Sequence, residues 1–400
     1  MGDIMKEKKN IPEIRFKGIE GKWGEVQLKD ISFKITEKNS EVKYTETFTN
    51  SAVYGIISQR DYFDNDISNS ENIDRYFVVK SDDFVYNPRI SSFAPVGPIN
   101  RNRLGRTGIM SPLYTVLRTQ NVDKTYLEQF FKTDRWHAFM RLNGDTGARS
   151  DRFSIKDFLF FEMPIPFPEV EEQSQIGSYF QNLDKQITLE QQKHDKLVTL
   201  KKAMLEKMFP KEGASVPEIR FEGFENPWIQ KEIKELFKIT RGEVLAATET
   251  SQVKTGFMTY PVYSSQTKNN GLMGYYHDYL FENAITWTTD GANAGTVKYR
   301  KGKFYSTNVN GVLLSDDGYA NQAIAESINI IAWKHVSYVG NPKLMNNVMS
   351  KIKIYISDSL EEQQLISDYF NTFDTFISLQ QQKIDKLKNI KKACLDKMFV

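Results

Sequence analysis

Two long segments of the chain carry apolar residues at a seven-residue spacing. The first extends from Gln173 to Met208, and the second lies at the C-terminal end. A seam only two residues wide per heptad is typical of a coiled coil, because a helix that packs on a globular core shows a broader apolar stripe. We predict one long helix in each segment, with the two seams buried against each other through Ile176, Phe180, Leu183, Ile187, Leu197, Met204, Ile366, Phe370, Phe373, Ile377, Ile384, Leu387 and Cys394.

The two segments belong to a longer internal repeat. Pro-Glu-Ile-Arg-Phe at residues 12–16 returns at residues 217–221, and the Glu-Glu-Gln at residues 171–173 returns at residues 361–363. The chain is therefore two copies of one unit, each opening with a short motif and closing with a long helix. Pseudo-twofold symmetry between the copies favours antiparallel pairing of the helices. Polar interruptions of a seam commonly fix its register, and they stand here at the equivalent positions Glu190 and Gln380, Lys201 and Lys391.

The sequences between the repeated parts do not match each other. The first insert mixes short β-type runs with a helix-like stretch over residues 124–140, whereas the second is richer in strand signals. The predicted fold class is α+β, with two mixed α/β domains separated by two long helices in an antiparallel coiled coil. The predicted boundaries are 1–22 for the first repeat segment, 23–168 for the first domain, 169–210 for the central helix, 211–228 for a linker with the second repeat segment, 229–358 for the second domain and 359–400 for the C-terminal helix.

A basic stretch in the first insert indicates contact with DNA. Between Gly97 and Arg118 four arginines occur without one carboxylate, among asparagines and glycines. Arg and Asn side chains pair bidentately with guanine and adenine edges, and glycines let a loop enter a groove. A solvated basic loop is the alternative interpretation. The candidate DNA-binding residues of this insert are Asn87, Arg89, Arg101, Asn102, Arg103, Arg106, Arg141, Asn143 and Arg149.

The second insert combines a glycine-bracketed turn with a basic strand. Residues 289–295 read Thr-Asp-Gly-Ala-Asn-Ala-Gly, which predicts a tight connection that exposes its backbone. The basic and aromatic residues that follow are typical of a ribbon that contacts phosphates. Glycine-rich turns are also common in β domains that bind no ligand. The candidates here are Ser265, Gln266, Thr289, Asp290, Asn293, Lys298, Arg300, Lys301 and Lys303.

Composition narrows the class of protein. A net charge of +2 over 400 residues is too mild to indicate nucleic acid by itself, so the location of the charges matters more than their sum. One cysteine, Cys394, excludes an internal disulfide and a multi-cysteine metal site, which fits a reducing cytosol. No apolar run approaches the roughly 18 residues that a membrane span needs. We expect a cytoplasmic protein with no membrane partner.

Motifs for catalysis are missing from the sequence. The Asn87-Pro88-Arg89 string lacks the second proline and the aromatic residue of an adenine methyltransferase loop, and no Gly-x-x-x-x-Gly-Lys-Ser/Thr string for nucleotide binding occurs. The four histidines are scattered, which argues against metal or acid–base roles. We therefore expect a non-catalytic chain that binds no metal and no cofactor itself.

The repeated motifs resemble those of a known family. The duplicated Pro-Glu-Ile-Arg-Phe-x-Gly…Trp, the Glu-Glu-Gln exits, the helix ends Lys-Lys-Ala-x-Leu-x-Lys-Met-Phe and the string Asp-Gly-Ala-Asn-Ala-Gly-Thr-Val-x-Tyr-Arg are similar to the specificity subunit of type I restriction-modification enzymes. The resemblance covers essentially the whole chain, and the helix repeats are its specific part. The first insert has no Asp-Gly-Ala-Asn-Ala-Gly string.

The resemblance implies a non-catalytic subunit with two target-recognition domains. Each domain would read one half of a split sequence in double-stranded DNA, and the coiled coil would act as the spacer. The implied partners are two modification subunits, which would carry S-adenosylmethionine and methylate adenine, and motor-nuclease subunits, which would use ATP and Mg.

Two other interpretations stay open at the level of sequence. A coiled-coil adaptor with two domains that bind something other than nucleic acid would differ only in whether the basic loops bind DNA. A stand-alone nuclease would require metal-dependent cleavage by the purified chain.

Overall fold

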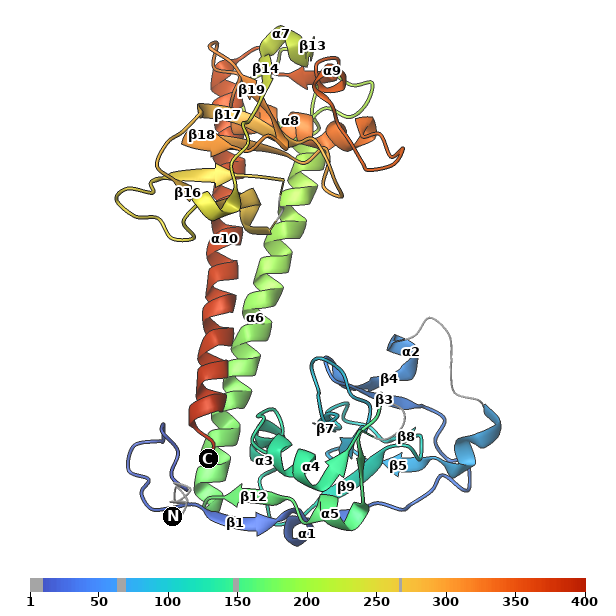
Figure 1. Cartoon of the computed structure of the whole chain (residues 1–400). Coiled ribbons are helices and arrows are strands. Elements are labelled where there is room, and N and C mark those ends of the chain that lie inside the picture. Colours follow the sequence, from blue (N-terminus) through green and yellow to red (C-terminus); the bar gives the residue numbers. More distant parts are fainter. Residues whose placement is uncertain (1–9, 63–69, 147–150, 266–267) are drawn as a thin grey trace. The chain divides into compact units, whose positions relative to one another are not determined.

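The two long helices predicted from the heptads are present and are shared by both halves of the chain (Figure 1). Helix α6 spans Val170–Met208 and helix α10 spans Leu360–Lys397. The computed structural model describes residues 10–62, 70–146, 151–265 and 268–400. It divides into unit 1, residues 1–190 with 383–400, and unit 2, residues 191–382, so each long helix contributes one half to each unit.

Within each unit the two half-helices pack antiparallel. In unit 1, Phe180 of α6 lies in one apolar core with Phe399, two residues beyond the end of α10. In unit 2, Phe370 of α10 lies in one core with Phe209, which directly follows α6. All thirteen predicted seam positions are buried or half-buried.

The polar interruptions of the seam make ion pairs across the helices. Lys391 Nζ lies 2.5 Å from Asp184 Oδ1 in unit 1, and Lys201 Nζ lies 2.7 Å from Asp374 Oδ1 in unit 2. Such pairs are satisfied in only one alignment of the helices. They therefore fix the register within each unit.

Unit 1 carries small sheets. A four-stranded sheet has the order β2 (Ser32–Lys34), β9 (Thr115–Thr119), β6 (Phe84–Tyr86), β7 (Ile99–Arg101). The paired strands are β1 (Gly24–Gln27) with β12 (Pro164–Phe167), β3 (Phe48–Ser51) with β4 (Gly55–Ser58), β5 (Phe77–Val79) with β8 (Gly108–Met110), and β10 (Gly144–Asp145) with β11 (Ser154–Ile155). The short helices are α1 (Leu28–Ile31), α2 (Gln59–Tyr62), η1 (Ser70–Arg75), α3 (Lys124–Phe130), α4 (His137–Asn143) and α5 (Asp157–Phe161).

The helix predicted over residues 124–140 is in fact two helices, α3 and α4. The Thr133 hydroxyl donates to the Phe130 carbonyl over 2.7 Å, and the Thr133 N–H donates to the same oxygen. A side chain that satisfies a backbone carbonyl at a helix end favours termination there. The apolar periodicity continues through the break because both helices bury residues in the same core.

Unit 2 is built on one six-stranded sheet. Its order is β14 (Lys238–Arg241), β19 (Asn310–Leu314), β17 (Phe281–Thr288), β18 (Val297–Ser306), β15 (Tyr260–Tyr263), β16 (Leu272–Tyr276). β13 (Ile229–Glu232) pairs separately with β20 (Lys353–Ile356). The helices are α7 (Ile233–Leu236), η2 (Ala247–Glu249), η3 (Lys268–Gly271), α8 (Gln322–Ala332), η4 (Trp333–His335) and α9 (Asn346–Met349).

The two faces of this sheet differ in chemistry. On one face Ile285, Trp287 and Leu313 form a core with helix α8. Residue 311 on this face must be a glycine, because a Cβ there would lie 2.1 Å from the Trp287 ring. Successive residues of a strand point to opposite faces, so Thr286, which follows Ile285, lies on the other face. That face is polar over part of its area.

In each unit the second glutamate of the Glu-Glu-Gln motif binds the arginine of the repeated Pro-Glu-Ile-Arg-Phe motif. Glu172 accepts two hydrogen bonds from Arg15, both 2.7 Å, and one from Trp23 Nε1 at 3.0 Å. Glu362 accepts the equivalent pair from Arg220, at 2.6 and 2.9 Å. Each duplicated Pro-Glu-Ile-Arg-Phe motif is thus fixed to the first turn of a long helix.

The glutamine of the same motif positions the helix of each insert. Gln173 accepts a hydrogen bond from the backbone of Asp123, the N-cap of α3, at 2.9 Å. Gln363 accepts one from Asn321, the N-cap of α8, also at 2.9 Å. Gly177 permits the approach in unit 1, because a Cβ there would lie 2.9 Å from Asp123 Oδ1.

Candidate nucleic-acid interface

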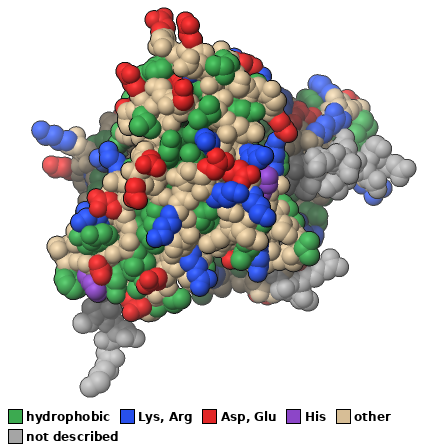
Figure 2. All heavy atoms as spheres, turned by 90° about the horizontal axis from the view of Figure 1, so that it is seen from above, with side chains coloured by type: hydrophobic (Ala, Val, Ile, Leu, Met, Phe, Trp, Pro, Cys, Tyr) green, Lys and Arg blue, Asp and Glu red, His purple; other side chains and the backbone are tan. Residues whose placement is uncertain are grey.

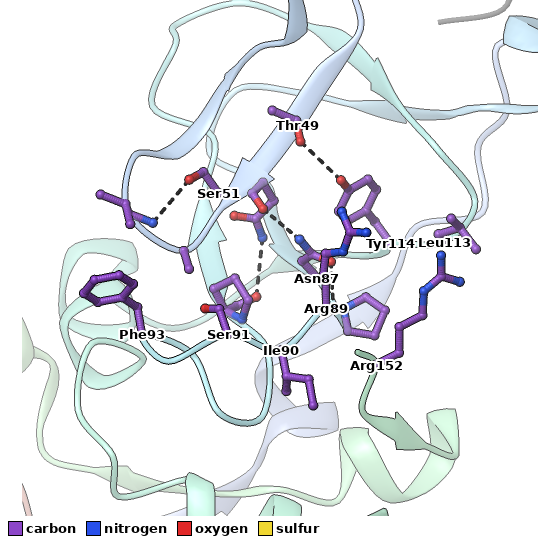
Figure 3. Close-up of a pocket in the computed structure, with 15 residues that line it drawn as sticks. Thr49, Ser51, Asn87, Arg89, Ile90, Ser91, Phe93, Leu113, Tyr114 and Arg152 are labelled. Atoms are coloured by element: carbon purple, nitrogen blue, oxygen red, sulfur yellow. Dashed lines mark hydrogen bonds between the residues drawn. The ribbon is translucent and has the colours of Figure 1, made fainter. Parts of the chain in front are cut away.

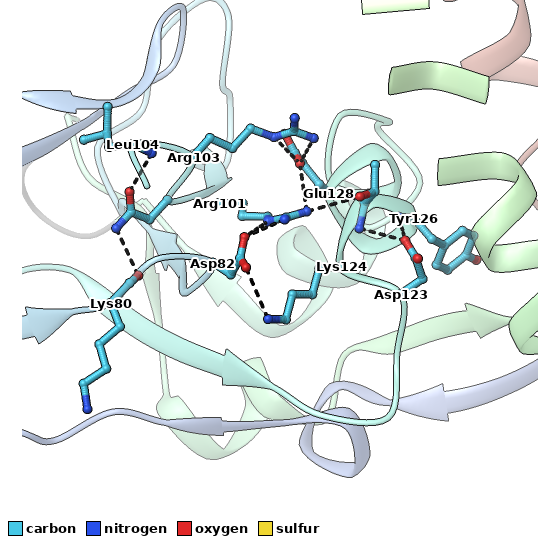
Figure 4. A network of polar contacts seen from close by, with 11 residues as sticks. Lys80, Asp82, Arg101, Arg103, Leu104, Asp123, Lys124, Tyr126 and Glu128 are labelled. Carbon is cyan, nitrogen blue, oxygen red and sulfur yellow. Dashed lines mark hydrogen bonds and ion pairs between the residues drawn. The ribbon is translucent and has the colours of Figure 1, made fainter. Parts of the chain in front are cut away.

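The arginines of the basic stretch in unit 1 are paired with carboxylates from distant parts of the chain (Figure 4). Arg101 lies 2.5 Å from Asp82 and 3.7 Å from Glu128, and Arg103 lies 2.5 Å from Glu128. Lys124 adds a second cation beside Asp82, at 3.4 Å. The lack of carboxylates in the local sequence is therefore offset by the fold.

Two further arginines of this stretch make bidentate ion pairs. Arg106 donates to both carboxylate oxygens of Glu46, at 2.7 and 2.8 Å, and Arg118 does the same with Asp83. The hydrogen bond from Arg106 lowers the pKa of Glu46, with burial opposing it. These pairs leave the stretch with little uncompensated positive charge. To contact DNA, its arginines would have to exchange their carboxylate partners for groups of the DNA.

Asn102 shapes the loop from inside. Its side chain is fully buried and donates to the carbonyls of Lys80 and Arg106, both at 3.0 Å. An amide used in this way has no donor left for an adenine edge. The residue positions its neighbours in this structure.

A cavity of about 370 Å³ in unit 1 brings together other predicted residues (Figure 3). Arg89 and Arg152 pair through an isolated β-bridge and both line the cavity. The Arg89 side chain is 71% exposed and lies 3.8 Å from Asp151, so it is only weakly neutralised. Asn87 is fixed beside it by donating to the Asn50 carbonyl at 2.8 Å. We call this cavity the Arg89 pocket.

The Arg89 pocket also exposes apolar side chains. Phe93 is 78% exposed and Leu113 is 58% exposed, and both line the cavity. Exposed apolar groups beside cations are suited to contact with thymine methyls and bases as well as phosphates. Arg152 belongs to the second basic cluster of the sequence, with Arg141, Asn143 and Arg149, and its bridge to Arg89 brings it to this cavity.

The remaining candidates of the first insert lie elsewhere. Arg141 is exposed on α4, and the Asn143 amide donates to the Phe139 carbonyl at 2.9 Å. Neither residue lines the Arg89 pocket. Arg149 lies outside the described residues.

In unit 2 the predicted basic strand is β18, and its cations fall into two groups. Lys301 and Lys303 are exposed, and the Lys303 ammonium lies 4.5 Å from the centre of the Tyr279 ring. Lys298 and Arg300 form the second group and line a cavity of about 230 Å³. Arg300 is only 8% exposed, so it is not part of an exposed phosphate ribbon.

The glycine-bracketed turn at residues 289–295 depends on the backbone conformation of its two glycines and on side-chain contacts at its start. Gly291 and Gly295 have φ values of +90° and +85°, which side chains other than glycine rarely adopt. The Thr289 hydroxyl donates to the Val309 carbonyl at 2.9 Å, and Asp290 lies 3.8 Å from Lys343. Asn293 is exposed at the tip. Ser265 is half-buried, and Gln266 lies outside the described residues.

Surface charge alone does not mark a site. On the face drawn in Figure 2, over the part that is described, Lys and Arg side chains are interspersed with Asp, Glu and hydrophobic ones.

Among the described residues no group of three or more His, Cys, Asp or Glu could hold a metal ion. No helix in the described part of the chain is long and apolar enough to cross a membrane.

Comparison with known proteins places the chain. Residues 225–389 match the family model of the type I restriction modification DNA specificity domain. A Mycoplasma pneumoniae protein described as the N-terminus of a type I specificity subunit is 38% identical over 144 residues, which are 35% of this chain and 75% of that relative. The chain belongs to the specificity-subunit family of type I restriction-modification systems.

Further relatives and solved structures agree with this membership. The specificity subunit of the type I restriction enzyme MpnII, also from Mycoplasma pneumoniae, is 30% identical over 46% of this chain and about half of its own length (52%). The crystal structure of a type I S subunit from M. genitalium superposes with a TM-score of 0.66 at 13% identity, covering 98% of this chain and 99% of that one. At this identity the match shows the fold, which is the predicted α+β fold with two long antiparallel helices.

Membership of the specificity-subunit family defines the role of the chain in outline. It is the DNA specificity subunit of a type I restriction-modification system, and this subunit is non-catalytic. The described part of the chain shows no cofactor site.

Proposed function

We propose that unit 1 and unit 2 each read one half of a bipartite DNA target and that α6 and α10 set the spacer between the halves. The observation that carries this proposal is the contrast between frame and insert. The Arg15–Glu172 and Arg220–Glu362 pairs repeat atom by atom. Gln173 and Gln363 each accept a hydrogen bond from the N-cap residue of an insert helix, Gln173 from the Asp123 backbone and Gln363 from the Asn321 side chain. Apart from the two-stranded sheets β1–β12 and β13–β20, the sheets of the two units do not repeat, and neither do their pockets.

A duplicated frame with unlike inserts suits two readers of different sequence. Two copies of one frame hold their inserts in equivalent ways, while each insert supplies its own side chains to a groove. The Arg89 pocket is the best-supported reading site in unit 1, because the Arg89 side chain is exposed and only weakly paired. In unit 2 the turn carrying Asn293 and the face of the sheet beside Lys298 offer the corresponding groups.

The equivalent halves of the frame also suit two copies of one partner. We infer that two modification subunits bind this chain and carry S-adenosylmethionine for adenine methylation. Motor-nuclease subunits would supply ATP- and Mg-dependent translocation and cleavage. A solved chain from a study of complex assembly in a type I system has this fold, with a TM-score of 0.51 at 15% identity.

Exchange of one domain tests the division of labour. Residues 23–167 are replaced by the matching domain of a relative, and the methylated sequence is mapped in cells that supply the modification subunits. One half of the recognised sequence should change and the other half should stay. The matched control replaces residues 229–355 and should change the opposite half. A change in both halves after either exchange would contradict modular reading.

A further inference from the structure

Arg300 is a buried guanidinium without a carboxylate partner. It is 8% exposed, and neither Arg300 nor Lys298 forms an ion pair with any residue that the structure describes. Burial lowers the pKa of Arg300 to about 10, because desolvation destabilises the cation. The arginines of the basic stretch in unit 1 meet carboxylates instead. A buried charge left uncompensated is costly, so this one is a candidate for an anionic ligand.

The guanidinium is held in a fixed orientation. Its centre lies 3.8 Å from the centroid of the Tyr263 ring, a cation–π contact. Nε donates to the Thr286 hydroxyl at 3.1 Å, and Nη1 donates to the Asn270 carbonyl at 2.8 Å. A guanidinium carries five N–H donors, so these two bonds do not exhaust it.

The strand register places the other polar groups beside it. Thr286 of β17 lies opposite Lys298 of β18, and Thr288 lies opposite Asn310 of β19. Cross-strand partners share one face of a sheet, and this is the face opposite helix α8. The cavity of about 230 Å³ on this face is lined by Ser264, Asn270, Thr286, Thr288, Thr296, Lys298, Arg300 and Asn310.

This lining suits a tetrahedral oxyanion. It contains two cations, hydroxyls and amides that can donate, and no carboxylate. Base edges in the major groove present donors as well as acceptors, and the amino groups of cytosine or adenine would meet cations here. A phosphate presents acceptors only, and its charge matches the uncompensated guanidinium.

We propose that the cavity beside Arg300 binds one phosphate group of the DNA backbone, with Arg300 and Lys298 as its cationic contacts. The proposal rests on unit 2 being a DNA reader. Phosphate contacts fix the register of a protein on the duplex and carry no sequence information directly. The cavity would therefore position unit 2 on its half-site, and the bases would be read by other residues.

Replacement of single phosphates tests the site. The chain assembled with its modification subunits is titrated with the cognate duplex in which one phosphate at a time is a neutral methylphosphonate. One position should weaken wild-type binding by roughly tenfold. At that position, the methylphosphonate should not weaken DNA binding by Lys298→Gln or Arg300→Gln any further. At all other positions, it should weaken binding by the variants as much as it weakens binding by the wild type. Each variant should also reduce the salt slope by about one.

Two variants separate phosphate binding from a structural role. The Lys298 ammonium makes no hydrogen bond or ion pair among the described residues, so Lys298→Gln should leave the melting temperature unchanged. Arg300→Lys keeps the charge and loses the fork, and it should recover part of the affinity. Lys351→Gln, an exposed lysine in the turn before β20, is the control and should keep the full salt slope. An intact slope and an undiminished methylphosphonate effect in Lys298→Gln would overturn the proposal.

A second arm uses inorganic phosphate with the full-length chain alone. At equal ionic strength, phosphate should raise the melting temperature of the wild type relative to chloride, and Lys298→Gln should remove this rise. If the wild type binds no DNA yet shows this rise, the reading function fails and the anion site stands. If the assembled protein recognises its target but shows neither effect, the anion site fails and the reading function stands.

Discussion

The two units share a frame but treat buried positive charge in opposite ways. In unit 1 each arginine of the basic stretch meets a carboxylate, as Arg118 meets Asp83. In unit 2 Arg300 is more deeply buried and meets only hydroxyl, carbonyl and aromatic groups. Charge density along a sequence is therefore a poor guide to charge available for a ligand. The partner supplied by the fold decides whether a cation is free to bind DNA.

The frames themselves differ at one contact. Trp23 donates its indole N–H to Glu172, whereas the equivalent Trp228 finds no hydrogen-bond acceptor for its buried Nε1 among the described residues. Glu172 therefore serves three donors and Glu362 serves two. The two copies share one architecture, but the contact at Glu172 has one more hydrogen bond than the equivalent contact at Glu362.

The largest effect should come from removing these glutamates. Glu172→Ala leaves the guanidinium of Arg15 without a carboxylate and the buried indole N–H of Trp23 without an acceptor, and should lower the free energy of unfolding by about 3–5 kcal/mol. Glu362→Ala should cost less because only Arg220 loses its partner. Urea unfolding followed by tryptophan fluorescence measures both. The exposed neighbours give the controls Glu171→Ala and Glu361→Ala, and equal losses in Glu172→Ala and Glu171→Ala would contradict the role of the pair.

The next effect compares the two cross-helix ion pairs. Lys201→Met leaves Glu326, whose side chain is 6% exposed, without a cation and should destabilise unit 2 by about 3 kcal/mol. Lys391→Met should cost about 1 kcal/mol, because Asp184 is more exposed and keeps Lys132 at 3.6 Å. Thermal unfolding of the two variants beside Lys202→Met, an exposed control, checks the order. The reverse order would show that burial of the carboxylate partner does not decide the loss of stability.

A smaller effect concerns DNA binding by unit 1. Arg89→Ala and Arg152→Ala should each reduce the salt slope of binding by about one, because these cations are weakly neutralised. Arg103→Ala should change the slope less, because Arg103 is already paired with Glu128. Salt titration of the assembled methyltransferase with cognate and random duplexes measures this. If Arg103→Ala relaxes one base position while Arg89→Ala does nothing, base reading lies in the basic stretch and not in the Arg89 pocket.

The smallest effect is a pH dependence in unit 1. The pKa of Glu46 is lowered in the folded protein, so its ionised form stabilises the fold above its ordinary pKa of 4.5, and this contribution is lost as the pH falls through the lowered value. As the pH falls, the free energy of unfolding of Glu46→Gln should therefore decrease less than that of the wild type. Stability curves between pH 6 and pH 3 compare it with wild type. A steeper acid loss in Glu46→Gln would contradict the sign.

Periodicity made the frame predictable, because it is a local property of the chain. The seven-residue seam gave both long helices, and the runs at residues 284–288 and 296–300 gave strands β17 and β18. The ion pairs of the basic stretch could not be predicted in this way, since Arg106 and Glu46 are 60 positions apart. The Arg89 pocket likewise forms from separate loops. Strand alternation could have indicated that Lys298 and Arg300 share a face, but not that the face is recessed.

The ruler function of the long helices is the central claim, and one insertion tests it directly. A heptad that keeps the seam is added to α6 between Gln191 and Leu200 and to α10 between Thr375 and Gln382, where it leaves the ion pairs of both units intact. Seven residues add about 10 Å at 1.5 Å each, which is about three base pairs at 3.4 Å. Mapping of methylated adenines should show both half-sites unchanged and their gap widened by about three base pairs. An unchanged gap in a folded, active variant would contradict the account.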